Sequence, residues 1–156
     1  ALYSQKYTSL SELKSGDMIA IPNDPTNEAR ALLLLAAQNI ITLRADAGLA
    51  ATPQDITENP LKLVFREIEA ATLPRILADV AAAVINGNYA IPAGLSASKD
   101  GLLVEGKDSP YANVIAVKQG NENAPRIQAL LKALQSDKVR AYIIEKYPNG
   151  EVVPAF

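Results

Sequence analysis

A strand pattern that runs through one tight turn into a helix pattern constrains the fold of this chain more than any other segment. Residues 18–21 are typical of a short buried strand, and residues 25–38 of a helix that is apolar on nearly every face. Asp24 is a good N-cap for that helix, and Pro25 suits its first position because proline has no N–H to leave unpaired. A helix that begins directly at a strand end turns its free N–H groups and its positive dipole end toward the adjacent crevice, which suits a carboxylate or a phosphate.

Two polar side chains lie in the first turns of this predicted helix. Arg30 is the only basic residue between Lys14 and Arg44. Asn27 precedes it by three residues, so that both lie on one helix face. A guanidinium and an amide at a strand-to-helix crevice predict a binding site for a small anion, and nothing in this segment indicates chemistry.

The composition excludes several functional classes. The 156 residues include 15 Lys and Arg against 17 Asp and Glu, a net charge of −2 with no long run of either sign. Nucleic acid is therefore not an expected partner, because phosphate neutralisation needs a clustered basic face. The absence of His and Cys removes histidine bases, thiolate nucleophiles, disulfides and the commonest metal ligands, so we expect no metal and no cofactor. The length suits one domain, or one domain and part of another.

Strand and helix patterns alternate along the chain, which predicts an α/β layer structure with a mostly parallel sheet. Residues 1–4 look like the middle of a strand rather than a natural start, so we expect the chain to be part of a longer protein. Short helices are predicted to open at Leu10, which Gly16 would close, at Pro53 and near Leu73. The remaining predicted elements are strands over residues 18–21, 61–68, 81–85, 101–105 and 113–118, and helices over residues 25–38, 125–135 and 137–147.

Polar side chains follow two of the predicted strands and flank the start of a third. In open α/β sheets, ligands bind outside the carboxyl ends of the strands. A planar arginine can clamp a carboxylate with two hydrogen bonds, and asparagine carbonyls can accept from an ammonium group. Together they describe a receptor for a zwitterion such as an amino acid. The candidate residues are Asn23, Asn27 and Arg30 after the first strand, Asn86 and Asn88 after residues 81–85, and Tyr111 and Asn113 at the junction before residues 113–118.

Each of these candidates also has an ordinary structural interpretation. Arg30 could pair with a buried carboxylate such as Glu69. Asn86 and Asn88 could form turns, because asparagine next to glycine favours them. Asn113 could lie at a strand edge, and Tyr111 is better explained by packing than by ligand contact.

Catalytic interpretations have less support. Asp24 is better explained as an N-cap than as a general base. Ser96 and Lys99 match the Ser-x-x-Lys pattern, but the other members of that catalytic motif set, Ser-Asp-Asn and Lys-Thr-Gly, are absent. A small α/β enzyme that uses Asp24 or Lys99 remains an alternative, as does a pure interaction module.

Six segments, in order along the chain, resemble the NlpA lipoprotein family, the methionine-binding lipoproteins of bacterial ABC importers. These segments are residues 21–27 with Arg30, 58–60, 73–75, 83–90, 107–113 and 152–156. The resemblance implies a hinged two-lobe receptor of the periplasmic-binding-protein type II fold. Residues 1–107 would form its second lobe, and residues 108–156 would be the crossover strand and C-terminal helices of the first lobe, whose N-terminal part is absent here.

The resemblance also implies a function and a ligand arrangement. Arg30 would hold the carboxylate of free methionine, with Asn86 and Asn113 near its amino group and Asn88 as a lesser candidate. The receptor would pass methionine to an ABC permease with its ATPase, and would face the periplasm or cell exterior on a lipidated cysteine that follows a signal peptide. The missing lobe would come from the same protein or from a swapped copy. Another amino acid or a dipeptide is an alternative ligand.

Overall fold

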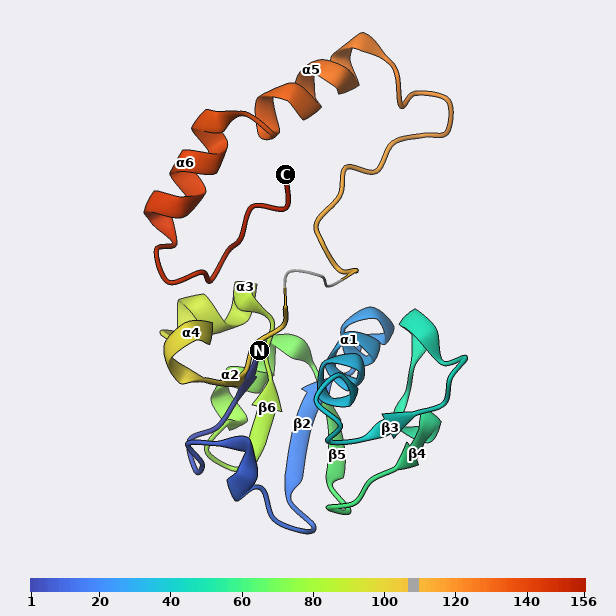
Figure 1. Ribbon diagram of the computed structural model, residues 1–156, viewed down its shortest axis with the longest axis vertical. Helices are drawn as coiled ribbons and strands as arrows, with labels where there is room; N and C mark the ends of the chain where they lie inside the picture. Colours follow the sequence, from blue (N-terminus) through green and yellow to red (C-terminus); the bar gives the residue numbers. More distant parts are fainter. Residues whose placement is uncertain (107–109) are drawn as a thin grey trace. The chain divides into compact units, whose positions relative to one another are not determined.

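The computed structural model describes residues 1–106 and 110–156, and the chain divides into two compact units, residues 1–105 and 106–156 (Figure 1). Residues 107–109, part of the predicted junction between lobes, lie outside the described residues. The first unit contains a five-stranded sheet with the strand order β5-β2-β6-β1-β7 and a separate two-stranded sheet of β3 and β4. The strands are β1 (Leu2–Tyr3), β2 (Met18–Pro22), β3 (Thr42–Leu43), β4 (Ile56–Glu58), β5 (Val64–Ile68), β6 (Ala82–Val84) and β7 (Gly101–Leu103).

The helices of the first unit connect these strands, and the second unit contains two further helices. The α-helices are α1 (Pro25–Ala36), α2 (Leu73–Ile76), α3 (Gly87–Ala90), α4 (Ala97–Asp100), α5 (Pro125–Leu134) and α6 (Asp137–Lys146). The single-turn 3₁₀ helices are η1 (Leu10–Glu12), η2 (Gly48–Ala50), η3 (Pro53–Asp55), η4 (Ala70–Thr72) and η5 (Ile91–Ala93).

The large sheet is mixed, with two parallel and two antiparallel pairings, whereas the alternating patterns predict a mostly parallel one. β2 pairs in parallel with both β5 and β6, and Figure 1 shows β2 between them with α1 beside the sheet. β1 is antiparallel to β6 and to β7, so that β7 runs in the same direction as β6. The predicted α/β fold class is confirmed, with β1 as the strand that makes the sheet mixed.

The core lies on both faces of this sheet. Ile19 and Ile21 of β2 pack with Leu32 and Leu35 of α1 in one hydrophobic cluster. Ala20, which points to the opposite face, belongs to a second cluster together with residues of α2 and β6. Helices on both faces bury residues 19–22 of β2, which is why its sequence is a continuous apolar run rather than an alternating one.

The second unit consists of α5, α6 and irregular segments. Ser136 caps α6 by accepting from the N–H of Val139. None of the described residues of this unit is buried, and the large apolar side chains exposed there include Leu130, Leu134 and Ile144. No helix in the described part of the chain is long and apolar enough to cross a membrane.

The strand predicted over residues 113–118 is wrong. The structure assigns these residues to no strand, and Val114 is 84% exposed. An alternating apolar pattern shows that a segment is able to pair, but a strand also needs a neighbouring backbone to satisfy its N–H and C=O groups. The described residues of the second unit contain no other strand that could supply one.

Other differences concern element boundaries in the first unit. The strand predicted over residues 61–68 begins only at Val64, because Lys62 has a positive φ of 49° and Asn59 bonds to both main-chain polar groups of Leu63 at 2.9 Å. The short helix predicted to close at Gly16 ends at Glu12. The β3–β4 pair was not predicted.

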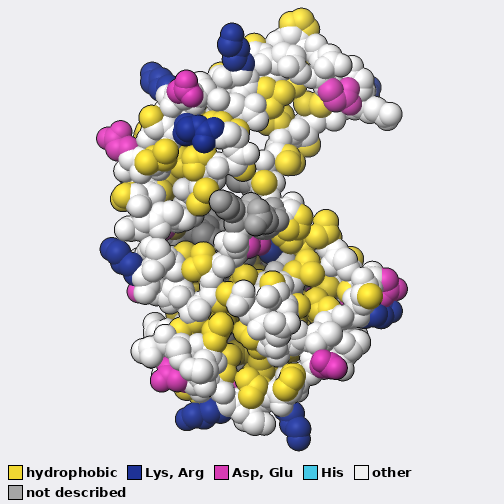
Figure 2. Space-filling model, viewed as in Figure 1, with side chains coloured by type: hydrophobic (Ala, Val, Ile, Leu, Met, Phe, Trp, Pro, Cys, Tyr) yellow, Lys and Arg dark blue, Asp and Glu magenta, His cyan; other side chains and the backbone are white. Residues whose placement is uncertain are grey.

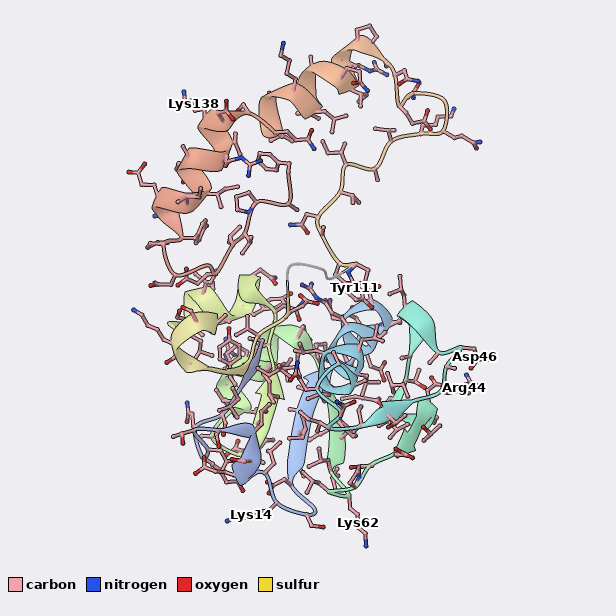
Figure 3. The ribbon with its side chains drawn as sticks, in the orientation of Figure 1. Lys14, Arg44, Asp46, Lys62, Tyr111 and Lys138 are labelled. Carbon is pink, nitrogen blue, oxygen red and sulfur yellow. The ribbon has the colours of Figure 1, made fainter. Side chains whose placement is uncertain are left out.

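Charged side chains do not form a patch of one sign on the face drawn in Figure 2, where Lys and Arg alternate with Asp and Glu in both units. Figure 3 labels one surface pair, Arg44 and Asp46, whose Nε and Oδ1 atoms are 2.9 Å apart.

Candidate ligand-binding site

The candidate site lies where β2 and β6 end and where α1 and α3 begin. Asp24 is the N-cap of α1, and its Oδ1 accepts from the main-chain N–H of Asn27 at 3.0 Å. Pro25 occupies the first helical turn, as predicted, so that α1 starts immediately after the strand. Asn86 occupies the N-cap position of α3 at the end of β6.

A hollow opens between these strand ends. The polar side chains in its lining are Asn27 and Arg30 from α1, Asn86 after β6 and Glu105 after β7. Ala31, Leu34 and Val84 supply apolar surface beside them. A hollow with a few polar groups among apolar ones is the usual form of a small-molecule site, and it brings together three of the predicted residues.

Arg30 carries the only cationic side chain of this lining. Its Nε donates to Glu105 Oε1 at 2.9 Å and to Oε2 at 3.0 Å, and its Nη2 donates to Oε2. The Arg30 and Glu105 side chains are 33% and 23% exposed, so water reaches the pair and weakens its electrostatic attraction. The pair presents one positive and one negative group to the hollow.

Glu105 was not among the predicted site residues. The alternative interpretation of Arg30 as the partner of a carboxylate was correct in kind but named Glu69, whereas the structure pairs Arg30 with Glu105. A signal was present in the sequence, because Glu105 ends the predicted strand 101–105 and the rule that led to Asn86 applies equally to it.

Asp24, Asn27 and Asn86 form a row of hydrogen-bonded side chains. Asn27 Nδ2 donates to both carboxylate oxygens of Asp24 at 3.0 Å. Asn86 Nδ2 donates to Asn27 Oδ1 at 2.6 Å. The row links the first turn of α1 to the end of β6 and is half-buried throughout.

The conformation of Asn86 does not support its interpretation as a turn former. Its φ and ψ are −68° and 145°, an extended conformation that needs no asparagine. Its main-chain carbonyl accepts from the N–H of Ala90 at 2.9 Å, while its side chain makes no capping bond and reaches Asn27 instead. The side chain of Asn86 is therefore directed to the site.

The other predicted residues are not assembled in this hollow. Asn23 and Asn88 are exposed in the first unit. Tyr111, labelled in Figure 3, and Asn113 belong to the second unit, where Tyr111 is half-buried and Asn113 is exposed. The site within residues 1–105 is therefore built from Arg30, Asn27 and Asn86, with Glu105 added.

The catalytic alternatives gain nothing from the structure. The N–H of Ser96, the N-cap residue of α4, donates to Asp100 at 2.7 Å, and its hydroxyl lies 3.1 Å from that of Ser98. Asp24 acts as an N-cap and a partner of Asn27. Among the described residues, no group of three or more Asp and Glu side chains could hold a metal ion.

Glu28 is a buried carboxyl on α1, 8% exposed. Burial raises its pKa above the ordinary carboxyl range, and the nearby carboxyl groups of Glu67 and Asp24 raise the pKa further. Glu28 does not line the hollow, so this effect concerns stability rather than the ligand.

Comparisons with known proteins agree on one family. The family model described as NlpA lipoprotein matches residues 1–156. The chain is similar to Membrane lipoprotein TpN32 of Treponema pallidum, with 54% identity over 155 residues, covering 99% of this chain and 58% of the relative. It is also similar to D-methionine-binding lipoprotein MetQ of Salmonella typhimurium, with 49% identity over 152 residues, covering 96% of this chain and 56% of the relative.

Solved structures with a similar fold include related lipoproteins and binding proteins. The structure of a nutrient binding protein from Burkholderia cenocepacia bound to methionine matches with a TM-score of 0.90 and 48% identity, covering 99% of this chain and 65% of that chain. The crystal structure of lipoprotein Tp32 from Treponema pallidum matches with a TM-score of 0.91. The chain thus spans less than two thirds of the length of these relatives.

Proposed function

The chain belongs to the NlpA lipoprotein family, and from this premise we propose that it forms part of a receptor that captures free methionine for an ABC importer. The observation that carries the proposal is the hollow in which Arg30, Asn86 and Asn27 meet at the carboxyl ends of parallel strands. A relative of the same fold binds methionine, according to the description of its structure. The proposal involves no catalytic step, no cofactor and no metal.

In the proposed complex, Arg30 binds the ligand carboxylate. A guanidinium can meet a carboxylate with two parallel hydrogen bonds, which gives orientation as well as affinity. Asn86 accepts from the ligand ammonium, and Asn27 supports Asn86. We place Asn113 and Asn88 around the ligand as further contacts, an assignment that rests on the family resemblance. Tyr111 is a further candidate because it lies at the same junction as Asn113.

The domain organisation is part of the proposal. Residues 1–107 form one lobe, and residues 108–156 contribute a crossover and helices to the other lobe, which a further part of the protein or a swapped copy completes. Two observations support this division: the relatives are longer than the chain, and no described residue of the second unit is buried. Ligand would be captured by closure of the two lobes, a shift in population toward the closed form.

The closed receptor would deliver methionine to a permease with its ATPase. Two relatives are named membrane lipoprotein and outer membrane lipoprotein, which supports a position at the bacterial periplasm or cell surface through a lipid anchor that follows a signal peptide. Another amino acid or a dipeptide is the second candidate ligand, because the hollow recognises the groups that all amino acids share.

Isothermal titration with L-methionine tests the proposal, on the 156-residue chain and on the full-length product of its gene. We expect saturable heat that Arg30→Ala weakens by about 100-fold, since a lost charge-assisted pair costs roughly 2–3 kcal/mol. Arg75→Ala, which removes an exposed arginine of α2, is the matched control and should leave the affinity unchanged. Leucine or glycyl-methionine that displaces methionine would contradict the ligand assignment, and no binding to either form of the protein would overturn the receptor function.

A further inference from the structure

The row of side chains at the site begins with a charge. The Asp24 carboxylate accepts two hydrogen bonds from Asn27 Nδ2, in addition to the one from the main-chain N–H of Asn27. Asn27 in turn accepts from Asn86. An N-cap needs only the main-chain bond, so the contacts between the Asp24 carboxylate and the Asn27 side chain exceed what capping requires.

The chemistry of these groups fixes the direction of every bond in the row. An ionised carboxylate can only accept, so Asn27 must turn its NH₂ group toward Asp24 and its oxygen away. That oxygen can only accept, so Asn86 must turn its own NH₂ group toward Asn27. The carbonyl oxygen of Asn86 is then directed away from Asn27, as the acceptor at the far end of the row.

An asparagine without such a row could present either its oxygen or its NH₂ group, because the two ends of the amide have nearly the same shape. A presented oxygen suits a ligand ammonium group, and a presented NH₂ group suits a ligand carboxylate. Successive hydrogen bonds also polarise one another, so the negative charge of Asp24 makes the terminal oxygen a better acceptor. The row therefore decides which end of a zwitterion Asn86 can bind.

We infer that Asp24 is a positioning residue, which acts through Asn27 to hold Asn86 Oδ1 as an ammonium acceptor and so makes the site select ligands with an α-ammonium group. This inference rests on the proposed function, because it takes the hollow to be an amino-acid site. Arg30 and Asn86 then recognise opposite ends of the ligand, and the selectivity of Asn86 is set two side chains away.

The substitution Asp24→Asn separates this role from capping. Asparagine is as good an N-cap as aspartate, so the start of α1 should be preserved. The amide that the substitution introduces can donate as well as accept, so the direction of the row is no longer fixed. Asp55→Asn is the matched control, because Asp55 accepts from the N–H of Thr52 in the capping box of η3 and does not line the hollow.

The test compares L-methionine with its des-amino analogue, in which hydrogen replaces the ammonium group. We expect Asp24→Asn to weaken methionine binding about tenfold, or about 1.4 kcal/mol, with no change for the analogue. The urea midpoint should fall less than in Asn27→Ala, because the cap of α1 is kept. Asp55→Asn should alter neither affinity. An unchanged ratio of the two affinities in Asp24→Asn would overturn the inference.

A measurement without ligand separates a failure of the inference from a failure of the proposed function. Exchange of the side-chain amide protons, followed by NMR, should be slower for Asn86 than for the exposed Asn88, and Asp24→Asn should remove the difference. Equal exchange in the wild type would overturn the inference whatever the protein binds. Slow exchange of Asn86 in a protein that binds no methionine would support the row and overturn the ligand assignment.

Discussion

Asn86 Nδ2 donates to Asn27 Oδ1 over 2.6 Å and thereby joins two residues that are 59 positions apart in the chain. One follows β6 and the other lies in the first turn of α1. The bond ties the β2–α1 and β6–α3 junctions together at the edge where the hollow opens, so that stability and ligand geometry depend on the same contact.

The substitution Asn27→Ala should destabilise the first unit by about 2 kcal/mol, because it removes three side-chain hydrogen bonds, of which two go to a charged group. Urea unfolding followed by circular dichroism measures this change. Asn88→Ala removes an exposed asparagine and should change the free energy of unfolding by less than about 0.5 kcal/mol. Equal effects of the two substitutions would show that the row contributes nothing to stability.

Glu105→Gln should strengthen binding of the des-amino analogue of methionine by about tenfold and change methionine binding much less. The ligand carboxylate is repelled by the Glu105 carboxylate by about 3 kcal/mol at 5 Å and an effective dielectric constant of 20. The ammonium group of methionine offsets this repulsion, and the des-amino analogue has no such group. The amide of glutamine retains an acceptor for Arg30. Titration calorimetry with both ligands measures the change, with Glu69→Gln as the control. Weaker binding of both ligands to Glu105→Gln would contradict the prediction and would mean that Glu105 is needed to hold Arg30 in place.

Glu28→Gln should stabilise the protein near neutral pH and reduce the dependence of its stability on pH. Because burial raises the pKa of Glu28, the folded state holds this proton more tightly than the unfolded state. Protonated Glu28 therefore stabilises the wild-type protein fully below the ordinary carboxyl pKa, and this stabilisation is lost as the pH rises through the raised pKa of Glu28. Urea midpoints measured from acid to neutral pH test this prediction, with the exposed Glu69→Gln as the control. A midpoint difference between wild type and Glu28→Gln that does not grow with pH would contradict the prediction.

Residues 1–105 alone should unfold cooperatively at the same urea concentration as the whole chain, because both hydrophobic clusters lie within them. Residues 106–156 alone should show little helix, since isolated helices of about ten residues are marginal in water. Circular dichroism of the two fragments measures both expectations. A lower midpoint for residues 1–105 would show that the second unit stabilises the first.

The parts of the fold that the sequence predicts are those with a local signal. The strand, cap and helix around Asp24 and Pro25 are encoded within a few neighbouring residues, and the structure confirms them. The strand over residues 113–118 could not be predicted correctly, because pairing depends on a partner that a local pattern does not reveal. The pairing of Arg30 with Glu105, 75 residues apart, depends in the same way on how the sheet brings β7 near α1.

In the candidate site, too, features with a local signal are predictable from the sequence, and features that depend on distant partners are not. The rule that ligands bind at strand ends places Arg30, Asn27 and Asn86 together, and the hollow contains all three. Their mutual hydrogen bonds could not be predicted, because the direction of an amide depends on partners a few ångströms away. Asn113 and Tyr111 keep their predicted roles as proposals.

The position of β1 in the sheet has a consequence for folding kinetics. Leu2 pairs with Val84 on one side and Leu103 on the other, and both Leu2 and Tyr3 are almost completely buried. These two pairings close loops of many tens of residues, and contacts so distant in sequence are slow to form. During synthesis, β1 therefore has no partner until β6 has left the ribosome, and the sheet is completed only when β7 follows.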